Sequence, residues 1–424
     1  MKKIGILTTF SKLDNISSKY NIVKNQIKML LLAGYNPKLV VLDDFEDESI
    51  IFKKVEIIKL PIALCNDNGE LPDDYQEKFD NIKKIFYEFI KDLDIIITHD
   101  IVYNLNYLIY NIICKEISNE FQDLKWLNWL YNINNLIKIS DSENIKEILS
   151  KPFINSFLIC NNSADIHRIA LDYNVEENNI KCVNDSVDIC DYFEFSNITR
   201  RLITEKDILS ADIIACYPMS WDRNCQIEIL IKIFNSLKIK FNKKVRLIII
   251  DFNSEKLDTD KDNYINEIDY LLNKLNLDNI DITFTSRYDT SLKNGCDKKI
   301  IKDFMLLSNI FILPSRNDIY SFIAQEAMLS NNFIILNRDY SPFKNIYKDC
   351  PRYFQFSSNV NALNDLDGVT TTTYKDEKEY WYEIANYIIY ELNNNRVLMG
   401  SNTIRKERNL KYIMKNQLEP LFYN

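Results

Sequence analysis

Residues 309 to 340 read NIFILPSRNDIYSFIAQEAMLSNNFIILNRDY, and they carry the clearest structural signal in the chain. The continuously apolar run at 310–313 predicts a strand buried on both faces of a parallel sheet, and Pro314-Ser315 ends it at the carboxyl edge. A loop with Asp318, a helix from Ser321 to Leu329 and a second strand at 333–336 follow. Open α/β sheets bind ligands at this edge, where a helix N-terminus favours phosphate. The stretch therefore predicts a ligand site.

Two acidic residues, Asp318 and Glu326, lie eight positions apart in this stretch. Taken alone, that spacing is typical of a solvated helix face. The flanking strand, proline, helix and second strand favour a ligand site instead.

This pattern resembles the donor-site signature of the retaining GT-B glycosyltransferases, which has proline-serine, an acidic residue, seven residues, then glutamate and alanine-methionine. Here it reads Pro314-Ser315, Asp318, seven residues, and Glu326-Ala327-Met328. The resemblance implies that Asp318 contacts the donor sugar and Glu326 the ribose of the nucleotide. It also assigns Tyr320 and Ser321 to the nucleotide, although the family usually has phenylalanine-glycine there.

The segment 213–237, IIACYPMSWDRNCQIEILIKIFNSL, is similar to the first strand, loop and helix of the family's donor domain. In the family this loop supplies an arginine and a lysine that neutralise the donor pyrophosphate. Aligning the helix puts Ser220 and Cys225 at those positions, and neither carries charge. Arg223 lies between them and is the candidate phosphate ligand, because a guanidinium pairs well with phosphate oxygens. A surface arginine is the alternative.

Two further strand ends carry candidate residues. After the strand 282–284, the resemblance implies that Thr285, Ser286 and Arg287 border the nucleotide base. His99 follows the apolar run 95–97, and the family places a histidine that touches the donor sugar at such a strand end. A structural histidine is the alternative, and the neighbouring Asp100 either orients the ring or caps the next helix.

Composition limits the classes of function. The chain has 424 residues, enough for two or three domains, and a net charge of −9, which argues against general nucleic-acid binding. It has six glycines, so glycine motifs are eroded throughout. Its nine scattered cysteines include no C-x-x-C pair and are interpreted as reduced core residues, and their odd number and the Lys-rich start favour the cytoplasm. A zinc site is disfavoured because only His99 and His167 could join the cysteines and neither shows ligand spacing, and no metal is expected. No apolar run is long enough to span a bilayer.

The first 40 residues contain seven lysines and one aspartate. This asymmetry either draws a phosphate-bearing or anionic lipid acceptor to the first domain, with peripheral membrane contact, or is a solvated lysine face.

Apolar runs alternate with helical patterns along the chain, which predicts parallel sheets. About four strands precede a polar, turn-prone stretch at 184–207, and a second series starts at 211. We therefore expect an α/β protein with two doubly wound, Rossmann-like domains facing a cleft, as the GT-B resemblance implies. The acceptor domain is expected at 1–195, with a returning C-terminal helix at 400–424, and the donor domain at 205–399.

The sequence thus predicts a cytoplasmic, metal-independent retaining glycosyltransferase that needs no cofactor. It would move a hexose from a nucleotide diphosphate sugar to a glycan, lipid or protein acceptor, with His99, Asp318 and Arg223 as catalytic candidates. Two alternatives stay open. A non-catalytic GT-B relative would bind a nucleotide sugar or a protein partner without turnover, and a sugar-nucleotide epimerase would share the architecture.

Overall fold

The computed structural model describes residues 1–11, 17–47, 49–65, 71–99, 104–131, 143–252, 259–315, 321–356, 363–364, 371–372 and 377–423. Their contacts divide the chain into two units. The first unit comprises Met1–Asp188 and Arg408–Asn424, and the second comprises Ile189–Glu407. The chain passes from the first unit to the second after Asp188, which is before the boundary expected near residue 200. It returns to the first unit at Arg408, which is after the boundary expected near residue 400.

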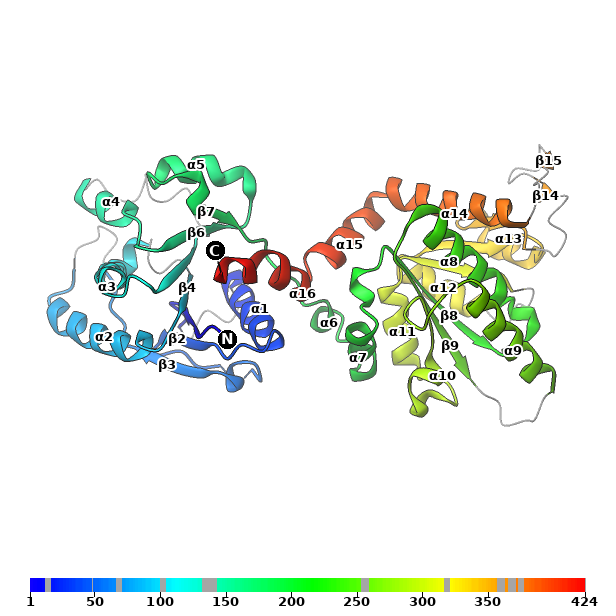
Figure 1. Cartoon of the computed structure of the whole chain (residues 1–424), viewed down its shortest axis with the longest axis horizontal. Coiled ribbons are helices and arrows are strands. Elements are labelled where there is room, and N and C mark those ends of the chain that lie inside the picture. The colour runs from blue at the N-terminus through cyan, green and yellow to red at the C-terminus, as the bar shows by residue number, and fades with distance from the viewer. Residues whose placement is uncertain are drawn as a thin grey trace. The chain divides into compact units, whose positions relative to one another are not determined.

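The first unit is built on a seven-stranded sheet in the order β3-β2-β1-β4-β5-β6-β7 (Figure 1). All neighbouring strands are parallel. The strands are β1 (Ile4–Leu7), β2 (Lys38–Leu42), β3 (Glu56–Leu60), β4 (Ile95–His99), β5 (Lys125–Trp129), β6 (Ser156–Cys160) and β7 (Ile180–Cys182). The order reverses between β1 and β4, as in doubly wound folds.

Helices cover both faces of this sheet. One face packs against α1 (Ser18–Leu32) and the C-terminal α16 (Leu410–Ile413) in a shared apolar core. The other face packs against α2 (Tyr75–Ile90), α3 (Leu108–Glu120), α4 (Glu143–Ser150) and α5 (Ile166–Asp172). Gly5 in β1 permits the approach of α2, because a Cβ there would lie 2.4 Å from the Phe89 ring.

The C-terminal segment returns to the first unit, as expected. The Tyr35 hydroxyl donates to Glu419 at 2.9 Å, and the Tyr35 ring meets Phe422 edge-on. Leu410, Ile413, Met414, Leu418, Leu421 and Phe422 are buried in the core on the α1 face.

The second unit contains two parallel three-stranded sheets, β10-β9-β8 and β11-β12-β13, and a short antiparallel pair, β14-β15. The strands are β8 (Ile213–Ser220), β9 (Val245–Phe252), β10 (Ile282–Phe284), β11 (Ile310–Leu313), β12 (Phe333–Asn337), β13 (Arg352–Phe354), β14 (Leu363–Asn364) and β15 (Thr371–Thr372). The two parallel sheets adjoin through Asn309, which exchanges two bonds of 3.0 Å with the backbone of Ile214. The combined order β10-β9-β8-β11-β12-β13 repeats that of the first unit.

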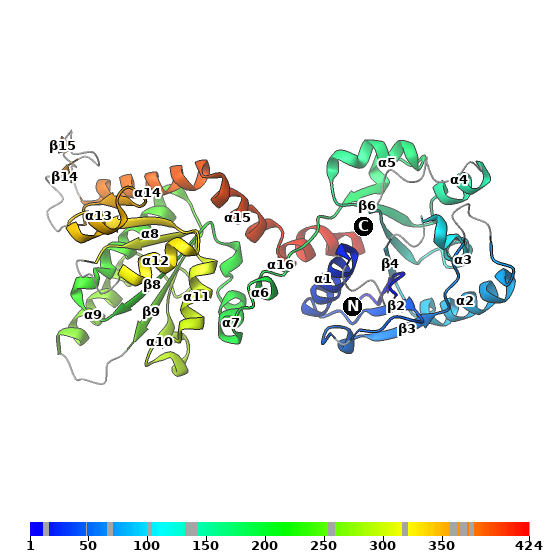
Figure 2. The same cartoon turned by 180° about the vertical axis from the view of Figure 1, so that it is seen from behind.

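The helices of the second unit are α6 (Ile189–Tyr192), α7 (Asn197–Glu205), α8 (Ile227–Phe241), α9 (Thr259–Lys274), α10 (Thr285–Tyr288), α11 (Lys298–Leu307), α12 (Ser321–Leu329), α13 (Ser341–Tyr347), α14 (Glu377–Asn394) and α15 (Arg396–Glu407). α8 packs against α9 and α14, whereas α11 packs against α7 and α12 (Figure 2). The helical connections between successive strands therefore pass over both faces of the combined sheet.

The predicted fold class of two doubly wound α/β domains with a returning C-terminal helix is confirmed. The expectation of about four strands in the first half was wrong, because β3, β5 and β7 were missed. The edge strand β3 (EIIKL) is largely exposed, β5 (KWLNW) mixes polar and aromatic residues, and β7 has three residues. None of them gives the continuous apolar run expected of a buried parallel strand.

The expectation of a turn-prone linker at 184–207 was also wrong, since this stretch contains α6 and α7. Ser196 caps α7 through its hydroxyl, and its backbone N–H donates to the fully buried Asp303 at 2.8 Å. Thr199 donates to the same carboxylate at 3.0 Å. The Ser cap and the hydrogen bonds to the buried Asp303 on α11 thus stabilise a packed helix in this polar stretch.

Candidate functional site

The predicted donor site lies where β11 runs into α12, next to β8 in the strand order. Ser315 is fully buried after β11, and the Asn337 amide donates to the Pro314 carbonyl at 2.7 Å. This bond from the end of β12 fixes the backbone turn that leaves the sheet. Asp318 and Tyr320 lie outside the described residues, and of Ser321 only its place at the start of α12 is described.

Glu326 lies in the second half of α12, and its side chain is about one-third exposed. Its carboxylate is 3.6 Å from the Nζ atom of Lys298, whose side chain is 90% exposed. A contact this long and this solvated holds the carboxylate only weakly. Glu326 is therefore free to exchange this partner for a hydroxyl-bearing ligand.

The loop after β8 contains the residues that stand at the family's cation positions. Ser220 ends β8, and its hydroxyl is 3.9 Å from the thiol of the buried Cys225. The two residues therefore do lie together, but as neutral groups.

Arg223 begins the 3₁₀ turn Arg223–Cys225 and is turned toward α9. Its guanidinium donates to both oxygens of Glu267 at 2.7 and 2.8 Å and lies 5.0 Å from the centre of the Tyr264 ring. These hydrogen bonds raise the pKa of Arg223 and lower that of Glu267. Both side chains are more than half exposed, so a phosphate would compete with Glu267 in water rather than in an apolar interior.

Asp251 at the end of β9 joins three loops at the carboxyl edge, and its role was missed in the sequence. Its carboxylate is 1% exposed and accepts from the Ser286 N–H at 3.0 Å, the Ser286 hydroxyl at 2.5 Å and the Trp221 indole at 3.2 Å. The Thr285 hydroxyl adds a longer contact of 3.4 Å. A buried carboxylate requires such donors. The signal was present, because an acidic residue directly follows the apolar strand RLIII.

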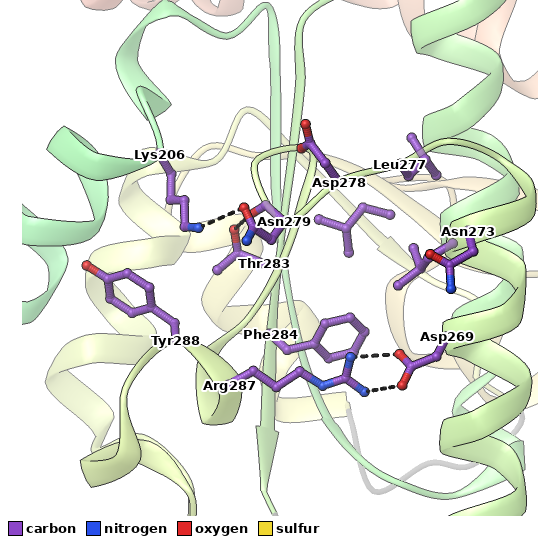
Figure 3. Close-up of a pocket in the computed structure, with 12 residues that line it drawn as sticks. Lys206, Asp269, Asn273, Leu277, Asp278, Asn279, Thr283, Phe284, Arg287 and Tyr288 are labelled. Carbon is purple, nitrogen blue, oxygen red and sulfur yellow. Dashed lines mark hydrogen bonds and ion pairs between the residues drawn. The ribbon is translucent and has the colours of Figure 1, made fainter.

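These bonds have a consequence for the predicted base-binding residues. Thr285 and Ser286 are buried and point to Asp251, so their side chains support the loop. Arg287 lies outside this cluster. Its guanidinium covers the Phe284 ring at 4.6 Å and pairs with Asp269 at 2.7 and 3.2 Å (Figure 3).

A pocket of about 500 Å³ includes Arg287 among its lining residues. It runs along the edge strand β10, between α9 on one side and Lys206 and Tyr288 on the other (Figure 3). Its charged groups are already engaged, since Lys206 donates to Asn279 at 3.1 Å and Arg287 to Asp269. β10 lies two strands away from the point where the strand order reverses, so this pocket is separate from the predicted donor site.

His99 ends β4 in the first unit and is 2% exposed. One ring nitrogen is 2.8 Å from the Gln26 amide oxygen on α1, and the other is 2.5 Å from the Tyr131 hydroxyl. Burial, with Lys19 nearby, lowers the pKa of His99 from 6.5 to about 3, so the ring is neutral. Because both nitrogens have partners, contact with a ligand requires one of these bonds to open. Asp100 lies outside the described residues.

His167, the other histidine, lies on the surface of α5 and contacts Glu177. Among the described residues, no group of three or more His, Cys, Asp or Glu side chains could hold a metal ion. No helix in the described part of the chain is long and apolar enough to cross a membrane.

No model of a known protein family matches the chain, and neither does any curated protein. Several solved structures are similar to it at low sequence identity. A glycosyltransferase from Rickettsia africae is 14% identical, with 99% of this chain and 98% of that one covered and a TM-score of 0.36.

HepE from Anabaena, in complex with UDP and glucose, is 13% identical over 98% of this chain and 95% of its own, with a TM-score of 0.32. A UDP-forming trehalose-phosphate synthase from Burkholderia xenovorans is 10% identical over 100% and 99%, with a TM-score of 0.34. WaaG, a glycosyltransferase involved in lipopolysaccharide biosynthesis, is 10% identical over 99% of this chain and 97% of its own, with a TM-score of 0.31.

Proposed function

We propose that this protein is a retaining, metal-independent glycosyltransferase that transfers a hexose from a nucleotide diphosphate sugar to an acceptor. The observation that carries the proposal is the position of α12 in the second unit. This helix follows β11, which adjoins β8 where the strand order reverses, and doubly wound sheets bind nucleotides at that point. Glu326 lies on this helix with its carboxylate weakly held.

The side chains position the donor in this proposal, and none of them attacks it. Glu326 accepts from the ribose hydroxyls and Asp318 from the sugar. The acceptor hydroxyl loses its proton to the donor phosphate on the face from which the phosphate leaves, so the configuration at the sugar is retained. His99 takes part only after its bond to Tyr131 opens.

Arg223 neutralises the diphosphate by exchanging Glu267 for phosphate oxygens. Two features support this exchange: the ion pair is exposed to water, and the guanidinium presents paired donors that also match phosphate. Replacing Glu267 by glutamine would leave Arg223 without a competing charge, so Glu267→Gln should tighten donor binding.

The acceptor is assigned to the first unit in this proposal. Some of the lysines near the N-terminus are paired there, because Lys28 meets Asp188 at 2.8 Å and Lys38 meets Glu56 at 3.0 Å. The acceptor, whether glycan, lipid or protein, is therefore not selected by charge alone. The cytoplasmic location in this proposal follows from the scattered cysteines of the sequence.

A calorimetric screen of UDP-, GDP- and ADP-sugars tests the proposal, with Glu326→Ala as the diagnostic variant. Glu383→Ala, on the exposed face of α14, is the matched control because it removes the same charge elsewhere in the same unit. The proposal expects one of the sugar nucleotides to bind, with loss of affinity in the first variant alone. If no sugar nucleotide binds the wild-type chain, the proposal fails.

A second candidate is a non-catalytic relative that binds a nucleotide sugar or a protein partner. The neutral Ser220 and Cys225 and the pairing of Arg223 with Glu267 favour it. Arg223→Ala distinguishes the two functions. It should weaken donor binding about tenfold or more if Arg223 binds phosphate, and leave binding unchanged if it does not.

The double variant Ser220→Arg, Cys225→Lys restores the charges that the family carries in this loop. In the transferase it should add little, because Arg223 already neutralises the phosphates. In the non-catalytic relative it should raise donor affinity or start donor hydrolysis. An inert Arg223 together with an inert double variant would exclude a diphosphate at this loop.

A further inference from the structure

We propose that Cys160 and Cys182 form a dithiol site that is oxidised to an intramolecular disulfide by peroxides or by small disulfide oxidants. This site lies in the first unit and does not depend on the proposed donor chemistry. It is carried by the register of two neighbouring strands, which makes the two cysteines direct partners, and by the hydrogen bonds around their thiols.

The two cysteines end neighbouring parallel strands, β6 and β7, which lie side by side in Figure 1. They are direct register partners, so their side chains leave the sheet on the same face, where both pack in the core beneath α5. Register partners on adjacent strands have Cα atoms about 4.8 Å apart, which falls within the range of about 4.4 to 6.8 Å that a disulfide requires. The Cα separation of the pair is therefore compatible with a disulfide.

The two thiols also lie close enough to influence each other's pKa. Cys160 is fully buried, and its thiol donates to the Asn162 carbonyl at 3.3 Å. Cys182 is half-buried and accepts from the Asn184 amide at 3.7 Å. Cys182 is thus the more exposed residue of the pair.

Cys182 is the sulfur expected to react first. Burial raises the pKa of both thiols, and at Cys182 the neighbouring Cys160 thiol and then Arg408 partly offset this effect by favouring the thiolate. The Cys182 thiolate attacks one oxygen of hydrogen peroxide, so an S–O bond forms, the O–O bond breaks and hydroxide leaves as Cys182 becomes a sulfenic acid. The Cys160 sulfur then attacks the Cys182 sulfur, so the S–S bond forms and the S–O bond breaks. The departing hydroxide takes the Cys160 proton, and the net change oxidises two thiols and reduces one peroxide to two waters.

The site is connected to the point where the C-terminal segment docks. Asn184, which donates to Cys182, also exchanges two hydrogen bonds with Gln417, at 2.7 and 3.0 Å. A disulfide sulfur is a poorer acceptor than a thiolate or thiol, so oxidation changes the environment of Asn184. We therefore expect oxidation to alter amide exchange in the segment Met414–Leu418.

The test treats the full-length chain with diamide or hydrogen peroxide, alkylates the remaining thiols in denaturant and maps the peptides by mass spectrometry. Two of the nine thiols should resist alkylation, and they should appear in one peptide that joins Cys160 to Cys182. Cys350→Ser is the matched control because Cys350 is exposed, and this variant should form the same cross-link. Cys182→Ser should abolish it.

A redox titration of the wild-type chain against dithiothreitol supplies a measurement that needs no variant to fold. It should show one reversible two-electron transition, with hydrogen exchange in Met414–Leu418 following the same midpoint. Alkylation of all nine thiols after oxidant treatment, or cross-links that involve Cys350 or a second molecule in place of this pair, would overturn the proposal.

Discussion

The carboxyl edges of the two sheets hold buried polar clusters of opposite character. In the first unit the cluster is neutral: His99 joins the end of β4 to Gln26 on α1 and to Tyr131. In the second unit it is charged, since Asp251 joins the loops after β8, β9 and β10. The same strand order thus carries two different buried clusters. One connects a strand to a helix by hydrogen bonds, and the other connects loops to each other.

The difference indicates where a ligand can be accommodated. In both clusters the buried polar groups bond to one another. In the second unit, however, the weakly held Glu326 and the exposed Arg223 lie outside the cluster. The loops that Asp251 holds rigid can therefore present these groups to a donor. In contrast, both ring nitrogens of His99 already bond to residues of the first unit.

Removing the charged cluster should have the largest effect of these substitutions at neutral pH. Asp251→Ala leaves the Ser286 and Trp221 donors buried without an acceptor, which should lower the free energy of unfolding by about 3 kcal/mol or more. Urea denaturation measures this loss. Asp262→Ala, on the exposed face of α9, is the matched control and should change little. A loss below that of the control would show that the loops do not depend on Asp251.

If Glu326 binds the ribose as proposed, Glu326→Ala should weaken nucleotide binding by about 2 kcal/mol, because a charged acceptor for the ribose hydroxyls is lost. Calorimetry with the nucleotide that binds the wild-type chain checks this value. The unfolding free energy of the variant should stay close to that of the wild type. Unchanged affinity in a folded variant would remove Glu326 from the site.

The neutral cluster should make stability depend on pH. The pKa of His99 is lowered from 6.5 to about 3, so below pH 6.5 the unfolded chain binds a proton that the folded chain does not. His99 therefore costs no stability above pH 6.5, and stability falls by about 1.4 kcal/mol for each pH unit between 6.5 and 3. His99→Gln should flatten this part of the profile, measured as unfolding free energy against pH. Parallel profiles for the two proteins would mean that the ring is not held neutral.

The smallest effect on stability is expected from the exposed ion pair. Arg223→Ala and Glu267→Ala should each leave the urea midpoint unchanged, because both side chains are more than half exposed to water and salt. The same two variants should differ in donor binding, since Arg223→Ala removes the proposed phosphate ligand whereas Glu267→Ala releases it. Equal affinities would remove Arg223 from the donor site.

Continuous apolar runs made much of the fold predictable from sequence. The segment 309–340 gave β11, α12 and β12 with bounds that differ little from those observed, because both strands are buried and α12 lies between clear strand signals. The strands β3, β5 and β7 were not predicted, because an edge position or a mixed composition removes the apolar run that marks a central strand.

The candidate site was harder to predict, because side-chain partners come from distant parts of the chain. Sequence could place Arg223 in the loop after β8, but the bond to Glu267 depends on how α9 packs. Similarly, the residues after β10 were expected at a ligand, and the buried carboxylate that holds two of them lies 35 positions away in sequence. Strand ends can thus be located from sequence, whereas the direction of their side chains depends on tertiary packing.

The returning C-terminal segment affects how the chain can fold during synthesis. The last 17 residues, Arg408–Asn424, complete the core on the α1 face of a unit whose other residues come first in the chain. A growing chain that has released all of Ile189–Glu407 still lacks Ile413, Leu418 and Phe422, so the first unit keeps part of an apolar face uncovered until Arg408–Asn424 has also emerged. Domains usually complete in the order in which they leave the ribosome. In this protein the unit that starts first is the one that finishes last.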